Sequence, residues 1–331
     1  MQAHPYPKRS LKKCNEYDCF EYLCEGSFGK VYKAYKGDDK EKVYALKFIP
    51  KKLLKEDVMK KAFNNEVKIM KAFNHPNLMG CHENIETDKE QCIVCDYYVD
   101  GDMEQYMKKR KVECFKESES LFYLKQICCG FMTLARRNVM HRDFKILNLF
   151  VDNGRVAIGD FGFSTIDGMI GKQWLGTPEY MAPELIRADN EETLRYDAKV
   201  DMYSLGVTFY VMLFNKLPFD PKSLKKDKQT EVEQKLHNLM TQMKGQFIMH
   251  YHINQISKPC VQLLKAMITM EPESRINFEQ LYNHKIMSDE HKAEVDGQIP
   301  EGKKIIPQDQ IDKGHEDFMK HREEYMKWLK E

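Results

Sequence analysis

The spacing of apolar residues changes partway along this chain, and the change limits the folds that the chain can adopt. Over residues 17–98, short apolar runs alternate with turn residues such as those at 37–39, which predicts β-strands joined by tight turns. Beyond residue 103, apolar residues recur at three- and four-residue steps, which predicts helices. We therefore expect an α+β fold, in which a small antiparallel-sheet part precedes a larger, mainly helical part at residues 99–287.

Individual elements can be placed within this pattern. One helix is expected in the sheet-rich part, from about residue 58 to Phe73, because Asn74-His75-Pro76 would end it. The helical part contains a stripe typical of a long buried helix, formed by Leu121, Leu124, Ile127, Cys128, Phe131 and Leu134. Further helices are expected near 199–214, 230–243, 257–269 and 276–284. We expect a ligand site where the two parts join, because ligands prefer such junctions.

Both ends of the chain differ from its middle. Residues 1–16 are polar and contain two prolines, so we expect a loose N-terminal arm. Residues 288–331 form a charged tail that ends in a helical pattern around Phe318, Tyr325 and Leu329. This last helix could bind a regulatory partner or inhibit the protein, but docking onto the helical part is the favoured interpretation.

The charge of the chain excludes some classes of partner. The formal net charge of +1 favours neither nucleic acid nor an anionic membrane as the main partner. No apolar run approaches the roughly 20 residues that a membrane-spanning helix needs. The first residues, MQAHPYPKRS, lack the apolar core of a secretion signal. We therefore expect a cytoplasmic protein, with the nucleus as the alternative location.

The ten cysteines raise the question of zinc binding or disulfide bonds. Only Cys92 and Cys95 form a CxxC motif, and they lie in an apolar run that predicts a strand. Side chains three positions apart on a strand point to opposite faces, which is poor geometry for holding one ion. We therefore expect free thiols.

Two features of the sheet-rich part suit a phosphate ligand. The stretch EGSFG, residues 25–29, lies between two predicted strands, where glycines would let backbone N–H groups approach phosphates. A simple hairpin turn is the alternative. Lys47 ends the apolar run VYALK, and it would need an anionic partner if it faced inward; Glu66 on the following helix could supply one. The alternative is a surface lysine with a partly covered stem.

A third feature is the stretch HRDFKILNLF at residues 141–150, which is followed by GDFG with Asp160. Asn148 and Asp160 offer the oxygen ligands that Mg²⁺ prefers when it also binds substrate phosphates. Asp143 could then accept a proton, and Lys145 could face the negative charge of a transferring phosphoryl group. So dense a cluster of charges among apolar residues suits a polyanion together with its metal ion.

In chain order, these motifs resemble those of eukaryotic protein kinases. The matching motifs are EGSFGKV, YALK with Lys47, Glu66, HRDFKILN, DFG at 160–162 and APE at 182–184. Asp201 and Arg275 are also similar to family residues, with Arg275 as the structural partner of Glu184. The likeness covers about residues 17–287, and it implies one bilobal kinase domain that uses ATP and Mg²⁺.

The resemblance implies a role for each catalytic position. Asp143 would orient and deprotonate the substrate hydroxyl, and Lys145 would stabilise the transferred phosphoryl group. Asn148 and Asp160 would hold two Mg²⁺ ions. Lys47, fixed by Glu66, would bind the α- and β-phosphates of ATP.

The resemblance also implies a nucleotide-binding set. Its members from the first two strands and their turn are Leu23, Cys24, Glu25, Gly26, Ser27, Phe28, Gly29, Lys30 and Val31. Ala45 and Phe150 would enclose adenine together with Val31. The stretch from Asp96 to Tyr98 would be the hinge whose backbone bonds the purine, and Asp102 could reach the ribose.

The class of substrate follows from two positions. Lys145 and Thr177, in HRDFK and GTPEYMAPE, resemble serine/threonine kinases and differ from tyrosine kinases. Phe163 is similar to the Unc-51-like and calmodulin-dependent groups. We expect an active serine/threonine protein kinase with protein substrates. The alternatives are a pseudokinase that acts as a scaffold or allosteric partner, and a small-molecule phosphotransferase.

The chain departs from the family pattern at three places. Cys24 replaces the first glycine of the glycine-rich turn, which predicts a modest loss of ATP affinity. Cys95 is a small residue at the position that controls the space behind adenine. Arg142 is typical of kinases switched on by phosphorylation, yet residues 166–176 contain no Ser, Thr or Tyr. Activity would then depend on autonomous order, on a partner, or on Ser164 and Thr165.

Overall fold

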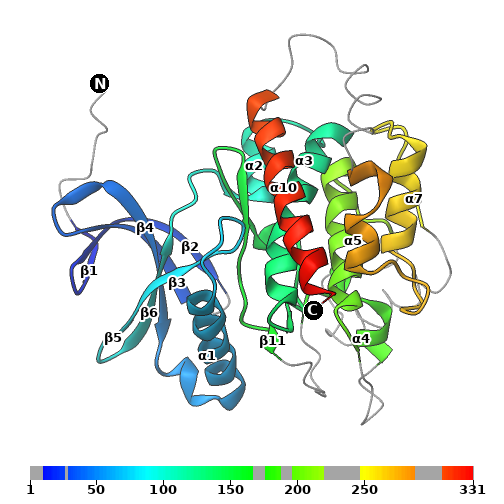
Figure 1. The fold of residues 1–331 in the computed structure, drawn as a ribbon. Helices are drawn as coiled ribbons and strands as arrows, with labels where there is room; N and C mark the ends of the chain where they lie inside the picture. Colours follow the sequence, from blue (N-terminus) through cyan, green and yellow to red (C-terminus); the bar gives the residue numbers. More distant parts are fainter. Residues whose placement is uncertain are drawn as a thin grey trace, which may run out of the picture. The chain divides into compact units, whose positions relative to one another are not determined.

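The computed structural model describes residues 10–26, 29–166, 176–187, 196–219, 247–287 and 308–330. The chain divides into two compact units. The sheet-rich unit contains the chain up to Val99 together with Gly159–Gly162, and the helical unit contains Asp100–Ile158 and the chain from Phe163 onward. The expected α+β class is confirmed, with one sheet-dominated and one helix-dominated unit (Figure 1).

One six-stranded antiparallel sheet forms the sheet-rich unit, in the order β1-β2-β3-β4-β6-β5. Its strands are β1 (Lys12–Cys14), β2 (Tyr17–Gly26), β3 (Gly29–Lys36), β4 (Asp39–Pro50), β5 (Cys81–Glu86) and β6 (Glu90–Asp96). A 3₁₀ turn, η1 (Leu53–Lys55), leads into helix α1 (Asp57–Ala72). The helix ends at the expected position, because Phe73 already has extended backbone before Asn74-His75-Pro76.

The expectation of a loose arm over residues 1–16 is wrong for its last part, because β1 pairs antiparallel with β2. Cys14 is buried there, while the ammonium of Lys12 lies 3.6 Å from the centre of the Phe48 ring. Lys12 Nζ also lies 2.5 Å from Glu90 Oε2. Polar composition concealed this strand, since Cys14 alone of its three side chains points into the core.

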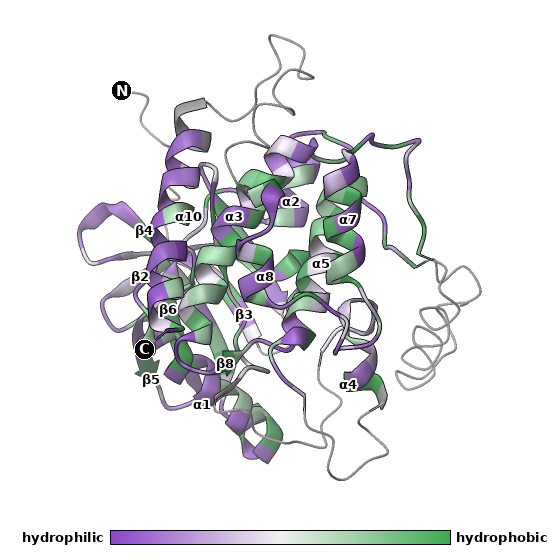
Figure 2. Cartoon of the chain, turned by 45° about the vertical axis from the view of Figure 1, so that its right-hand side comes forward, coloured by the Kyte–Doolittle hydropathy of each residue, from purple (hydrophilic) through white to green (hydrophobic). Residues whose placement is uncertain are grey.

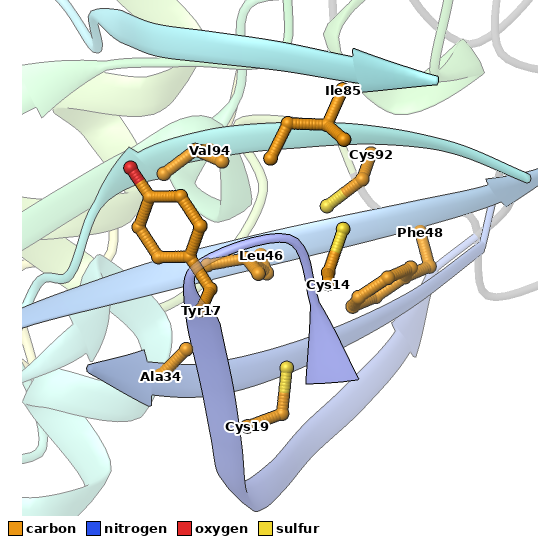
Figure 3. Packing of buried hydrophobic residues seen from close by; sticks show 9 residues of the cluster. All are labelled: Cys14, Tyr17, Cys19, Ala34, Leu46, Phe48, Ile85, Cys92 and Val94. Carbon is orange, nitrogen blue, oxygen red and sulfur yellow. The ribbon is translucent and has the colours of Figure 1, made fainter. Parts of the chain in front are cut away.

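One core cluster of the sheet-rich unit lies on the sheet face that Cys14 of β1 joins. Its members are Cys14, Tyr17, Cys19, Ala34, Leu46, Phe48, Ile85, Cys92 and Val94 (Figure 3). The sulfur atoms of Cys14 and Cys92 point toward one another in this cluster. All ten cysteines are free thiols, as expected, and burial raises the pKa of Cys92 far above its usual value.

Helices dominate the second unit. They are α2 (Met103–Lys109), α3 (Glu117–Ala135), α4 (Pro183–Arg187), α5 (Lys199–Phe214), α7 (Lys258–Met267), α8 (Phe278–Tyr282) and α10 (Gln308–Trp328). The 3₁₀ turns are η2 (Ile146–Asn148), η3 (Pro178–Tyr180) and η5 (Lys285–Met287). Two small antiparallel sheets join strands β7 (Gly101–Asp102), β9 (Leu149–Asp152) and β10 (Arg155–Ile158), and strands β8 (Val139–Met140) and β11 (Thr165–Ile166).

The expected helices can be compared with these elements. The stripe that begins at Leu121 lies on α3, and all its members are buried. Helices expected at 257–269 and 276–284 correspond to the shorter α7 and α8, and the one expected at 199–214 is α5. Helix α5 is buried along almost its whole length and is coloured mainly as hydrophobic in Figure 2, so it forms the centre of the unit. The helix expected at 230–243 lies outside the described residues.

The tail helix docks onto the helical unit, which was the favoured interpretation. Helix α10 runs along α3 (Figure 1). Phe318 is fully buried there, and Tyr325 packs edge-on against Tyr282 at 5.3 Å between ring centres. Lys125 Nζ bonds His315 Nδ1 at 2.7 Å. Phe318 and Tyr325 are therefore covered by the chain's own helices, whereas Leu329, beyond the end of α10, is 43% exposed.

Membrane insertion can be judged from the helices of the described ranges. None of them is both long enough and apolar enough to cross a bilayer.

Candidate active site

Lys47 and Glu66 form a buried ion pair in the sheet-rich unit. Lys47 lies on β4, a central strand, and Glu66 lies on α1. Lys47 Nζ lies 2.7 Å from Glu66 Oε1 and 2.9 Å from Oε2. The Lys47 side chain is only 20% exposed, so the alternative of a surface lysine is wrong. Burial opposes the charge of Lys47, but the carboxylates of Glu66 and Asp160 outweigh it and raise the pKa of this lysine.

Strand register determines which residues share a face of the sheet with Lys47. Val31 on β3 lies directly opposite Lys47, and Ala45 lies two positions before it on β4. Because side chains alternate along a strand, these three residues share one face, whereas Leu46 joins the core on the other. Cys95 on β6 lies opposite Ala45 and is buried. Two of the expected adenine contacts, Val31 and Ala45, therefore lie with Cys95 on the face that carries the ammonium of Lys47.

The glycine turn joins β2 and β3, with Gly26 paired to Gly29. A Cβ atom at Gly29 would lie only 1.9 Å from the backbone oxygen of Phe48, so this position admits no side chain. The two strands form a hairpin, and phosphate binding by its turn stays a prediction. Cys24 is exposed on β2 opposite Val31. Ser27 and Phe28 lie outside the described residues.

The end of β6 carries the expected hinge. The carboxylate of Asp96 lies 2.7 Å from His82 Nε2 on β5. The ring of His82 packs edge-on against Tyr44, 5.4 Å away between ring centres. Tyr98 is buried two residues later. His82 thus fixes the side chain of the first hinge residue.

Asp160 belongs to the sheet-rich unit. Its backbone has a φ of +63°, a left-handed conformation that is uncommon outside glycine and that marks a strained turn. Asn65 on α1 donates a hydrogen bond from Nδ2 to the carbonyl oxygen of Phe161 at 3.3 Å. The turn that carries Asp160 is therefore tied to the same helix as Glu66.

Asp143 is the centre of a hydrogen-bond network in the helical unit. Its Oδ1 accepts bonds from the backbone N–H of Thr177 at 2.7 Å and from the Thr177 hydroxyl at 2.9 Å. Its Oδ2 accepts a bond from Lys145 Nζ at 2.9 Å, and Lys145 also donates to Thr177 Oγ1 at 2.7 Å. These donors hold the buried carboxylate of Asp143 in one orientation, beside the ammonium of Lys145.

A second layer of contacts fixes the backbone of this loop. The N–H groups of His141 and Arg142 donate to the two carboxylate oxygens of Asp201 on α5, at 2.6 and 2.8 Å. Burial raises the pKa of Asp201, although these two N–H groups oppose the shift. A Cβ atom at Gly176, whose φ is +119°, would lie 2.9 Å from the carbonyl oxygen of Arg142. Glycine therefore lets the Thr177 segment approach the loop.

The remaining predicted residues of the helical unit have partners of their own. Asn148 on η2 donates from Nδ2 to the carbonyl oxygen of Asp143 at 2.8 Å, so its amide oxygen is the atom suited to a metal ion. Asp102 caps α2 by accepting a bond from the N–H of Gln105 at 2.9 Å. This cap gives Asp102 a structural role beside its expected contact with ribose. Phe150 lies on β9 opposite Asp102.

Two of the predicted residues carry oxygen atoms of the kind that a hard cation binds. A carboxylate at Asp160 and an amide oxygen at Asn148 are ligands that Mg²⁺ accepts. Within the described ranges, no three His, Cys, Asp or Glu side chains are grouped so as to hold a metal ion.

The segment after DFG contains the two hydroxyl residues considered for phosphorylation. Ser164 and Thr165 are only 4% and 5% exposed. Ser164 Oγ lies 3.4 Å from the carbonyl oxygen of His141, and Thr165 pairs with Met140 in the β8–β11 sheet. Another kinase could not reach either hydroxyl without opening this segment. Residues 167–175 lie outside the described part of the chain.

Sequence reasoning missed two polar contacts of this region. One is His82, which holds Asp96, and the other is Tyr196, whose hydroxyl accepts a hydrogen bond from Arg142 Nη1 at 3.0 Å. Neither residue lies within a motif, and each is 14 or more positions from its partner. No local pattern could have indicated them.

Comparison with known proteins agrees with this geometry. A family model described as "Protein kinase domain" matches residues 17–287. A probable serine/threonine-protein kinase PLK of Dictyostelium discoideum is 30% identical over 275 residues, which cover 82% of this chain and 26% of that protein. The serine/threonine-protein kinase SIK3 homolog of Danio rerio is 32% identical over 297 residues, or 86% of this chain and 23% of the relative.

Another relative agrees with the resemblance to the Unc-51-like group noted at Phe163. Serine/threonine-protein kinase ULK3 of Xenopus laevis is 28% identical over 277 residues, or 82% of this chain and 55% of that protein. The chain thus spans about a quarter to about half of the length of these three relatives. The three relatives have different kinase names but similar sequence identities to this chain, so the likeness is not confined to one group of kinases.

Proposed function

Because the chain belongs to the protein kinase family, we propose that it is an active serine/threonine protein kinase, which transfers the γ-phosphoryl group of Mg-ATP to hydroxyl groups of proteins. The observation that carries this proposal is the network of Asp143, Lys145 and Thr177 in the helical unit. Each group in it suits a different part of phosphoryl transfer.

The carboxylate of Asp143 would orient the substrate hydroxyl and accept its proton as the oxygen attacks phosphorus. Its two oxygens are already fixed by Thr177 and Lys145, so little reorganisation is needed when substrate arrives. The ammonium of Lys145 would stabilise the negative charge on the transferring group. The bond between Lys145 and Thr177 also supports a serine/threonine substrate class, since both residues match that class in the sequence.

The sheet-rich unit would bind the nucleotide. Lys47, held by Glu66, offers a charged donor to the α- and β-phosphates, and the turn between Gly26 and Gly29 offers backbone N–H groups. Mg²⁺, held by Asp160 and Asn148, would neutralise charge on the phosphates. The protein would contribute mainly by positioning the reactants and by stabilising charge.

The test is transfer of labelled phosphate from ATP to a casein-like protein, with Asp143→Asn as the variant. We expect transfer to fall by about 10²- to 10⁴-fold, because the acceptor for the hydroxyl proton is lost. Asp152→Asn is the matched control, because the carboxylate of Asp152 bonds Asn153 and Arg155 at the surface, and its loss should leave transfer unchanged. Wild-type protein that binds ATP, detected by a raised melting temperature, but transfers no phosphate would instead be a pseudokinase scaffold.

A further inference from the structure

Arg142 joins three segments of the helical unit. Its backbone N–H is held by Asp201, and it directly precedes Asp143. Its side chain donates from Nε to the carbonyl oxygen of Phe163 at 2.7 Å and from Nη1 to the hydroxyl of Tyr196 at 3.0 Å. The guanidinium therefore ties the catalytic loop to the segment that follows DFG and to the segment that leads into α5.

The backbone conformation of Arg142 depends on the contacts that its side chain makes. Its φ is +65°, a left-handed conformation that is strained in a residue other than glycine. Such a conformation persists only where the surroundings hold it. The surroundings here are Asp201 on the backbone side and Phe163 and Tyr196 on the side-chain side.

The partners of the guanidinium are a carbonyl oxygen and a phenol hydroxyl. Neither of these two side-chain partners carries a charge. Residues 166–176 contain no Ser, Thr or Tyr that could carry a phosphate, and Ser164 and Thr165 are buried. In kinases that are switched by phosphorylation, an arginine–phosphate pair orders this region. Tyr196 supplies a hydroxyl oxygen to the arginine without any modification.

We propose that Tyr196 is a positioning residue, whose hydroxyl holds the Arg142 guanidinium and thereby keeps Asp143 and the β8–β11 pair ordered in the unphosphorylated protein. The proposal rests on the proposed kinase function for its kinetic consequence, but its structural consequence is independent of activity. Regulation by phosphorylation of this segment is then unnecessary for catalysis.

The kinetic test uses Tyr196→Phe, which keeps the ring and removes only the hydroxyl. We expect kcat to fall about tenfold, as for the loss of one hydrogen bond to a charged group. The KM for ATP should stay the same, since Lys47 and the glycine turn are untouched. Tyr251→Phe is the matched control, because Tyr251 is an exposed tyrosine of the same unit. Phosphatase treatment should leave wild-type activity unchanged.

A double-mutant cycle separates this role from general packing. If the hydroxyl acts through the guanidinium, Tyr196→Phe should add almost nothing to the loss caused by Arg142→Met. Additive losses in the cycle would overturn the proposal. So would a Tyr196→Phe protein with the kcat of the Tyr251→Phe control.

Amide hydrogen exchange tests the contact without any assay of activity. In Tyr196→Phe, the amides of residues 139–142 and 163–166 should exchange about tenfold faster than in wild type and in Tyr251→Phe, because their segments lose one tie. Faster exchange in a protein that transfers no phosphate would refute the proposed function and leave the role of Tyr196 intact. Unchanged exchange would refute the role of Tyr196 and leave the kinase proposal intact.

Discussion

Glu184 and Arg275 form a buried ion pair whose loss should destabilise the helical unit measurably. The Arg275 side chain is 0% exposed. Its Nη1 and Nη2 lie 2.5 and 2.9 Å from the two carboxylate oxygens of Glu184. The guanidinium also donates to three carbonyl oxygens, those of Thr269, Lys199 and Met270. The substitution Glu184→Gln would remove the only carboxylate in this set and place an amide N–H₂ group against a donor.

The magnitude follows from the burial of the charge that remains. Removing one partner of a buried ion pair typically destabilises a protein by about 3–5 kcal/mol, because the other charge stays buried without compensation. The three carbonyl oxygens still accept bonds from Arg275, so we expect the lower figure, about 3 kcal/mol. At about 2–4 °C per kcal/mol for a unit of this size, the melting temperature should fall by about 6–12 °C.

The assay is urea unfolding followed by tryptophan fluorescence, since Trp328 lies on α10 of the helical unit. Glu273→Gln makes the same chemical change at an exposed position two residues from Arg275 and should shift the midpoint little. Equal stability of the Glu184→Gln and Glu273→Gln proteins would refute the reasoning. A double-mutant cycle with Arg275→Met compares free energies of unfolding. The loss in the double variant should be smaller than the sum of the two single losses by at least about 1 kcal/mol.

Two further predictions concern the nucleotide site. Cys24→Gly should lower the KM for ATP modestly in steady-state kinetics, because the exposed Cys24 side chain occupies a position where the family has glycine; an unchanged KM would contradict this. Cys95→Phe should weaken binding of bulky ATP-competitive inhibitors while sparing ATP, because it fills space on the face shared by Ala45 and Lys47. Equal losses for inhibitor and ATP in a binding titration would show that the substitution distorts the whole site.

Local sequence patterns predicted the elements that carry the site. The period-two and period-3.6 spacing of apolar residues indicated β4, α1, α3 and α5, because burial of one face imposes those periods on the chain. The motif at residues 141–148 could also be interpreted from the sequence, because Asp143, Lys145 and Asn148 lie close together along the chain. Strand β1 escaped prediction because its single buried side chain is too short a pattern.

The longer contacts needed the tertiary structure. Thr177 was predicted to mark the substrate class, but its two hydrogen bonds to Asp143 cross 34 positions of the chain. The tie between Arg142 and Tyr196 spans 54 positions, and the bond between Lys125 and His315 spans 190. A hydrogen bond depends on the positions of two atoms to within a fraction of an ångström. Residue spacing does not contain that information.

By itself, the sequence determined the α+β class, the order of the main elements and the chemical groups available for phosphoryl transfer. Those properties depend on local periodicity and on which side chains are present. The tertiary structure alone decided that Lys47 is a buried partner of Glu66, that α10 covers α3, and that a tyrosine hydroxyl holds Arg142. Each of these depends on where distant segments meet, and packing of the whole unit sets that meeting point.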